Sequence, residues 1–454
     1  MGAVAFALVV AGLLWFAATD PKRFVLMTLV LAGLPMEVLT NAERFLSGSL
    51  DVDAQAIYMF AVLVGCSLVI AMRTARAYAI VSRMPAVVAF LALALASFAW
   101  ADSVVYGLRM FVKLLTPLLF MWTAALATEE GLQAGDVARA VYGAAILLVG
   151  LAVTNLALHG ALGALSTVPG LAGLPQLAAP YTSPSNFSFA LAVAILIALG
   201  QWSNRRQAGY LVFAIALTAA VAFALCRAAL AGLLVGYFAY STIGREHPLR
   251  RLALAGGVVV VSAAVLFSLP EFRHRMFFDP ESVSWSAVLS DPRSVLEHLD
   301  TSGRDQLWTA AAADFQGRSP WLGSGVGSVD RWIRDRDVRG SELHSDIYRL
   351  YLDLGAIGLG LFSLVLASCA AAALRGFRRG ADRIAAFPVA RVAVGALACY
   401  AATLPTDNSL NYVANFAVLV FGLLGCAMAR GATVAGVPIV PADAPPRRFA
   451  NVLE

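Results

Sequence analysis

Charged residues are scarce in this sequence. Asp, Glu, Lys and Arg make up 13% of the 454 residues, whereas they make up roughly a quarter of a soluble globular protein. Hydrophobic residues account for 60%, and the mean hydropathy is +0.77. This composition excludes a soluble globular protein and indicates a polytopic membrane protein.

Cysteines are few and scattered. None belongs to a CxxC pair, and all fall in or at the ends of apolar segments: Cys66, Cys226, Cys369, Cys399 and Cys426. The sequence therefore gives no disulfide framework and no thiolate zinc site, and these side chains are expected to pack among helices. No basic run interleaves with aromatic residues, so no nucleic-acid partner is expected. The apolar N-terminus lacks the charge and cleavage site of a secretory signal, which favours a helix over 3–18.

Long apolar stretches predict the fold. A membrane-crossing helix needs about 20 mainly apolar residues. Thirteen stretches of roughly that size occur, one of them marginal: 3–18, 24–39, 55–72, 84–100, 104–127, 138–158, 186–201, 209–226, 228–243, 252–269, 347–374, 386–404 and 412–429. We expect an all-α polytopic membrane protein with about 12–13 transmembrane helices.

Lys and Arg are distributed unevenly among the short loops. Seventeen lie in one alternating set of loops and in the C-terminal tail, whereas the other short loops hold only Arg44. Because positive residues are retained in the cytoplasm, the loops that hold only Arg44 are expected outside. Attraction to anionic lipids explains the lysines and arginines of the other set. The chain then divides into N-terminal transmembrane helices (1–269, about ten spans), a large, partly helical external loop (270–346), C-terminal transmembrane helices (347–430) and a disordered cytoplasmic tail (431–454).

The external loop carries nine arginines and no lysine. The planar fork of arginine suits phosphate or carboxylate binding. Ser302 and Asp305 have the spacing of a capping box and predict a helix that begins near Arg304. A cation in a first turn opposes the helix dipole, so Arg304 is a candidate binding residue. A solvated surface arginine is the equally open alternative.

Three more cations are predicted near the external surface. Arg227 interrupts about 35 apolar residues from 209 to 243, a length that requires two spans joined by a very short turn. A charge in such a place either faces an aqueous cavity or extends to the lipid headgroups. Arg109 and Lys113 lie four residues apart on one helix face, where the same two interpretations apply.

No metal or other cofactor is expected. Asp51 and Asp53, and likewise Asp335 and Asp337, have DxD spacing, but two carboxylates alone do not define a metal site. The stretch GSGVG at 323–327 follows no predicted strand, so we interpret it as a turn-rich loop rather than a dinucleotide-binding motif.

His344 lies where a polar loop enters the 347–374 stretch. Ser341 is a plausible N-cap, which would place His344 in the first helical turn. Helix N-terminal amides disfavour a charged imidazole, and a neutral histidine can act as a general base. A histidine that merely occupies a helix start is the alternative. Glu342 and Asp346 do not share its helix face and are not obvious orienting partners.

Three stretches in this order resemble the C-terminal half of the bacterial O-antigen ligase and polymerase superfamily: SGRDQLW, GRSPWLGSGVGS and LHSDIYRLYLDLGAIGLGLF. Pro320, Gly323 and Gly325 fit its P-x-x-G-x-G loop. His344, Ser345, Gly355 and Gly358 fit every fixed position of the ligase form of its histidine motif. Arg227 is similar to the family's Ser-Arg-Gly arginine, with Cys226 and Ala228 as different neighbours. Asn186, in YTSPSNFSFAL, is similar to its asparagine at the start of a span.

The resemblance implies a glycosyltransferase of the bacterial inner membrane that acts on the periplasmic face. The donor would be an undecaprenyl-diphosphate-linked glycan and the acceptor a sugar hydroxyl of lipid A–core. Arg227 and Arg304 would stabilise the departing diphosphate without a metal. His344 would accept the acceptor's proton, Tyr348 would form a wall of the acceptor site, and the anomeric configuration would invert. Arg109, Lys113 and Asn186 are further candidates for substrate binding.

Other functions stay open at this point. A polymerase that joins repeat units would use the same donor and similar groups, although the full histidine motif favours the ligase. A protein O-oligosaccharyltransferase is a further possibility. A transporter or flippase would need charges near the membrane midplane and often shows internal repeats. The sequence shows neither feature.

Overall fold

The protein is described here from a computed structural model. It describes residues 2–40, 53–162, 165, 176–243, 268, 273, 277, 290, 304–336, 342–378 and 387–429. Within those ranges there is no strand. The N-terminal helices are α1 (Gly2–Thr19), α2 (Pro21–Leu31), α3 (Met36–Thr40), α4 (Ala54–Ala71), α5 (Thr74–Val81), α6 (Pro85–Ala96), α7 (Val104–Glu129) and α8 (Ala134–Ala157). They are followed by α9 (Pro184–Arg205), α10 (Ala208–Phe223), α11 (Arg227–Thr242), α16 (Arg304–Asp314), α17 (Ser328–Asp335), α18 (Asp346–Arg378), α20 (Val389–Thr403) and α21 (Val418–Met428).

Helix boundaries follow the local sequence. The carboxylate of Asp20 accepts hydrogen bonds from the Lys22 and Arg23 amides, and Pro21 occupies the first position of α2. Ser183 caps α9 in the same way, with its hydroxyl accepting from the Asn186 amide. Proline at the first position and a capping oxygen before it are both favoured at helix N-termini.

Several helices have the length and composition of membrane spans. Among the described residues five qualify, namely α4, α7, α8, α9 and α18, and the pair α5 and α6, bent by 96°, raises this number to six if it counts as one span. Each predicted apolar stretch contains a helix, except 252–269, which lies outside the described residues apart from Ser268. The helical, multi-pass character is supported to this extent, and the number of 12–13 spans stays a prediction.

The predicted stretch 24–39 is not one continuous helix. It divides into α2 and α3, with a turn between Leu31 and Met36 that contains Gly33 and Pro35. Proline lacks an amide hydrogen and clashes with the preceding turn, so the helix ends before it. The 209–243 stretch does divide as predicted, into α10 and α11. Leu225 in the connecting turn has a left-handed φ of 51°.

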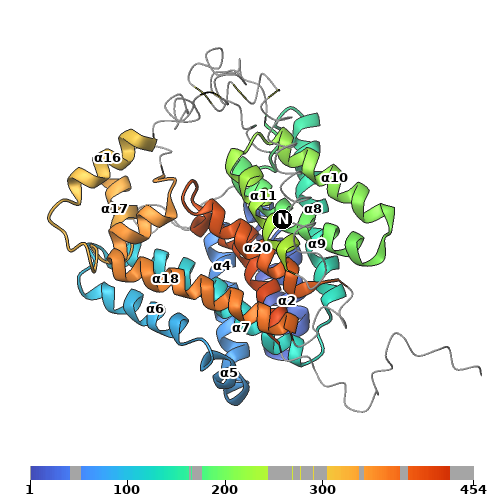
Figure 1. The fold of residues 1–454 in the computed structure, drawn as a ribbon, viewed down its shortest axis with the longest axis horizontal. Helices are drawn as coiled ribbons and strands as arrows, with labels where there is room; N and C mark the ends of the chain where they lie inside the picture. Colours follow the sequence, from blue (N-terminus) through green and yellow to red (C-terminus); the bar gives the residue numbers. More distant parts are fainter. Residues whose placement is uncertain are drawn as a thin grey trace, which may run out of the picture.

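The main core is a bundle in which α11 packs on α20, α21 packs on α7, and α9 packs on α10 (Figure 1). Small residues permit close approach between these helices. A Cβ added at Gly236 of α11 would lie 2.7 Å from the carbonyl oxygen of Gly395 on α20. Such small-residue contacts are typical of helix packing in membranes.

Helices α16 and α17 lie together at one side of the molecule, next to the start of α18 (Figure 1). They share a separate small apolar cluster, whose fully packed members are Ala311, Val329, Leu343 and Leu352. The predicted helix near Arg304 is thereby confirmed as α16, which begins at that residue, and GSGVG lies in a series of turns as predicted.

Helix α18 is interrupted at Gly355, where φ is 68° and ψ is −172°. The loop around Pro320 fills the interruption: the Ala356 amide donates to the Pro320 carbonyl oxygen (2.9 Å), and the Gly325 amide donates to the Asp353 carbonyl oxygen (2.8 Å). The Asp353 carboxylate accepts from the amides of Gly327 (3.0 Å) and Val329 (2.9 Å). The two glycine-containing motifs of the sequence therefore form one interlocked unit.

We expect Gly355→Ala to destabilise the protein. The left-handed backbone penalises any side chain, and the new Cβ would lie 2.2 Å from the Trp321 carbonyl oxygen. Gly360→Ala in the same helix is the control, because its Cβ would meet nothing within 4 Å. Thermal unfolding of the purified variants in one detergent should show a clear loss for Gly355→Ala alone. Equal midpoints for the two variants would contradict the interlock.

Candidate functional site

The candidate site forms where the start of α18 meets the connection that follows α20, residues 404–411, here called the 404–411 loop. Helix α18 begins at Asp346, and the Ser345 hydroxyl caps it by accepting from the Tyr348 amide (3.2 Å). The prediction that Ser341 caps this helix, with His344 in the first turn, is therefore wrong. His344 precedes the helix and has a left-handed φ of 50°. Ser341 itself lies outside the described residues.

One buried amide connects His344 to Glu342. The Nδ2 of Asn408 lies 3.2 Å from His344 Nδ1 and also donates to the Glu342 carboxylate. The Asn408 side chain is fully buried. Glu342 is thus an indirect partner of His344 through a residue 64 positions away, an arrangement that local spacing does not predict.

Arg304 reaches the same loop from α16. Its Nη1 donates to the Thr406 carbonyl oxygen, while its buried Nε has no hydrogen-bond partner among the described residues. The protein thus holds one N–H of the guanidinium, and this partly exposed side chain has further N–H donors, which suits an anionic ligand. Arg304 and His344 therefore both contact the 404–411 loop.

Burial and charge keep His344 neutral. Partial burial lowers the pKa of its imidazole below 6.5, and the charge of Arg304 lowers it further, while Asp407 and Glu342 act in the opposite direction. The ring is consequently uncharged near neutral pH, which the sequence predicted on the different ground of a helix N-terminus.

Beside the 404–411 loop lies a group of paired charges. Arg349, 1% exposed, donates to the Asn411 side-chain oxygen (3.0 Å) and lies 3.4 Å from an Asp330 oxygen. Lys113 contacts the same two partners, at 2.8 Å to Asn411 and 3.8 Å to Asp330. Burial alone would raise the pKa of Asp330, but Arg349, Lys113 and Arg109 outweigh it and lower the pKa below its ordinary value.

Arg227, half-buried, is the first residue of α11, and the residue before it, Cys226, lies on the side of the site that contains Asp407. Asp407 lies within electrostatic range of both Cys226, the preceding residue, and His344. Its carboxylate accepts from the Tyr412 hydroxyl at 3.0 Å. Asp407 therefore links the start of α11 to the histidine.

Two further predicted residues form contacts between helices. Tyr348 faces α16, where its hydroxyl donates to the Trp308 carbonyl oxygen (3.3 Å) and its ring stacks edge-on against Trp308. Asn186 donates to the Asn415 side-chain oxygen (3.1 Å), inside the bundle. Asn415 in turn donates to the Ala32 carbonyl oxygen (2.6 Å), so this contact ties α9 to α2.

The two DxD pairs are only half described. Asp53 caps α4 by accepting from the Ala56 amide (2.7 Å), and Asp335 pairs with Arg331 (3.3 Å). Asp51 and Asp337 lie outside the described residues. Within the part of the chain that the structure describes, no three His, Cys, Asp or Glu side chains gather as a metal site requires.

The site contains residues that the sequence did not single out, above all Asp407, Asn408, Asn411 and Arg349. One signal was available: TDNSLN at 406–411 places six mostly polar residues in a short loop between two apolar segments. Carboxamides that are buried in such a short loop are expected to form hydrogen bonds with specific partners.

Comparison with known proteins adds no assignment. No protein-family model matches the sequence, and no curated protein matches it. The resemblance to the O-antigen ligase superfamily therefore depends on the quoted motifs.

We expect Asp330→Asn to destabilise the fold, because it leaves the buried Arg349 without its carboxylate. Such a loss costs about 3 kcal/mol, whereas Asp335→Asn, in an exposed pair, costs about 0–1 kcal/mol. Because the pKa of Asp330 is lowered, its contribution is complete above its ordinary pKa, near 4, and disappears as the pH falls through the lower folded value. Thermal unfolding of the wild type and of Asp330→Asn from pH 7 to below about 4 should show their midpoints converging. A constant difference between the two midpoints would contradict this.

Proposed function

We propose that the protein is a glycosyltransferase of the bacterial inner membrane, with its active site on the periplasmic face and its C-terminus in the cytoplasm. In this proposal it transfers a glycan from undecaprenyl diphosphate to a sugar hydroxyl of lipid A–core, with inversion and without a metal. The motif resemblance supplies the reaction class. The geometry of the described site supplies the chemical support.

One observation carries the proposal: the Arg304 guanidinium and the His344 imidazole meet at the 404–411 loop, where burial and the charge of Arg304 lower the pKa of the histidine. Diphosphate departure creates negative charge, which a positioned guanidinium stabilises. A neutral imidazole can exchange a proton or a hydrogen bond with the reacting groups. Arg227, at the start of α11, is the second cation that we assign to the diphosphate.

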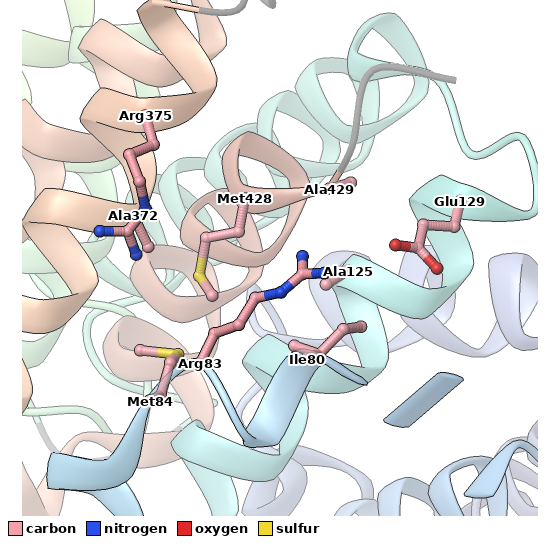
Figure 2. Close-up of a pocket in the computed structure, with 9 residues that line it drawn as sticks. All are labelled: Ile80, Arg83, Met84, Ala125, Glu129, Ala372, Arg375, Met428 and Ala429. Carbon is pink, nitrogen blue, oxygen red and sulfur yellow. The ribbon is translucent and has the colours of Figure 1, made fainter. Parts of the chain in front are cut away.

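The contacts divide the predicted loop residues into two separate groups. Residues predicted outside come together: Arg304 contacts Thr406, His344 contacts Asn408, and Lys113 contacts Asn411. Residues predicted in the cytoplasm come together elsewhere, with Arg83, Glu129 and Arg375 around one pocket (Figure 2). Loop residues that the lysine and arginine counts assign to the same side of the membrane are thus also neighbours in the structure.

Transfer activity of purified protein tests the function. With carrier-linked glycan and lipid A–core acceptor, we expect a new glycosidic bond, and a loss of about 10²–10⁴-fold in His344→Asn. Asparagine tolerates the left-handed backbone of this position, so the variant should fold. Arg304→Ala should lose comparable activity, whereas Arg334→Ala, exposed on α17, should not. Full turnover in His344→Asn would exclude a chemical role for the histidine.

Gene deletion separates the two glycan-transfer functions. Loss of a ligase leaves bare lipid A–core while carrier-linked polymer accumulates, and this is the result we expect on a lipopolysaccharide gel. A core capped with a single repeat would indicate the polymerase instead. A protein that moves glycan across vesicles without making a glycosidic bond would be a flippase.

A further inference from the structure

A pocket at the other end of α18 has the features of a phosphate site. It lies between the break that joins α5 to α6 and the C-terminal ends of α7, α18 and α21 (Figure 2). Charged residues from three of these helical segments line it, over an apolar floor that includes Ile80, Met84 and Met428. Helical rise places its Arg375 roughly 40 Å along α18 from the His344 end.

Two arginine side chains line this pocket with no partner among the described residues. Neither the Arg83 nor the Arg375 guanidinium forms an ion pair or hydrogen bond with any of them, and Figure 2 shows the two side chains on different walls. The neighbouring Arg73, by contrast, is engaged in a two-point contact with Glu130 (2.5 and 3.2 Å). Glu129 is the one acidic lining residue, so the pocket retains a net positive charge.

We propose that this pocket binds the phosphate of an anionic phospholipid headgroup. Arginine forks bind phosphate oxygens in pairs. The methionine and isoleucine side chains offer contact to the glycerol and upper acyl chains. The pocket lies at the ends of α7 and α18, two helices long and apolar enough to cross a membrane, which is the level of the headgroups.

Lipid titration followed by native mass spectrometry tests this site. We expect one phosphatidylglycerol to be retained per protein in preference to phosphatidylcholine, and at least about tenfold weaker retention in Arg83→Gln/Arg375→Gln. Arg23→Gln/Arg139→Gln removes the same charge from exposed positions on the predicted cytoplasmic side and should retain the lipid. Equal losses in both double variants, or inorganic phosphate competing as well as the lipid, would overturn the proposal.

A second inference concerns the proton on His344 and comes from a different contact. An amide nitrogen has hydrogens to donate and accepts none, so Asn408 Nδ2 donates to both Glu342 and His344 Nδ1. The Glu342 carboxylate, which can only accept when ionised, fixes which way the Asn408 amide points. Nδ1 of His344 is therefore the acceptor, and the neutral ring carries its proton on Nε2.

We infer that His344 acts as a hydrogen-bond donor through Nε2, with Asn408 as its positioning residue. This rests on the proposed function and changes the predicted role of the histidine from base to donor. As the acceptor oxygen bonds to the anomeric carbon, the carbon–oxygen bond to the diphosphate breaks, and its electron pair leaves with the diphosphate. Nε2–H bonds to that departing oxygen, and the acceptor's proton passes to the Asp407 carboxylate.

Nitrogen-15 NMR of histidine-labelled protein reads the tautomer directly, with His344→Asn identifying the signal. We expect protonated Nε2 in the wild type and protonated Nδ1 in Asn408→Asp, whose carboxylate would accept from Nδ1, together with a transfer rate at least about tenfold lower. Protonated Nδ1 in the wild type, or an Asn408→Asp enzyme as fast as wild type, would overturn the inference. An inactive wild type with protonated Nε2 would instead refute the proposed function.

Discussion

The buried guanidinium of Arg349 is the constraint on which the rest of the site depends. A charge removed from water is tolerated only with a counter-charge and hydrogen bonds around it. Asp330 and Asn411 provide these from α17 and the 404–411 loop. Those two segments must therefore stay against α18. Because Asn408 and Thr406 belong to the same loop, the surroundings of His344 and Arg304 are held in place as well.

Helical elements could be predicted from the sequence because apolar stretches and proline positions act locally. Helix α16, the division between α10 and α11, and the turns of GSGVG all follow from nearby residues. The cap of α18 was assigned to the wrong serine, since Ser341 and Ser345 are both plausible by type and only the backbone distinguishes them. Spacing also did not show the break between α2 and α3, because the hydropathy of 24–39 continues across it.

The site was predictable only in part, for a different reason. His344 and Arg304 belong to motifs, whereas Asn408 contacts the histidine across 64 residues and no periodic pattern records such a contact. Tyr348 and Asn186 were predicted to bind substrate, and the structure adds that each connects helices. The Tyr348 hydroxyl donates to the Trp308 carbonyl oxygen, and the Asn186 amide donates to Asn415. A motif shows which residues are unusual, whereas their contacts in the structure show which helices or loops they connect.

The backbone of His344 carries a cost in stability. A left-handed φ of 50° costs a residue with a side chain about 1–2 kcal/mol relative to glycine. Glycine at this position would therefore relieve the strain, but it would also remove the contact between the imidazole and Asn408. Under the proposed function, stability and activity thus make opposite demands on one residue.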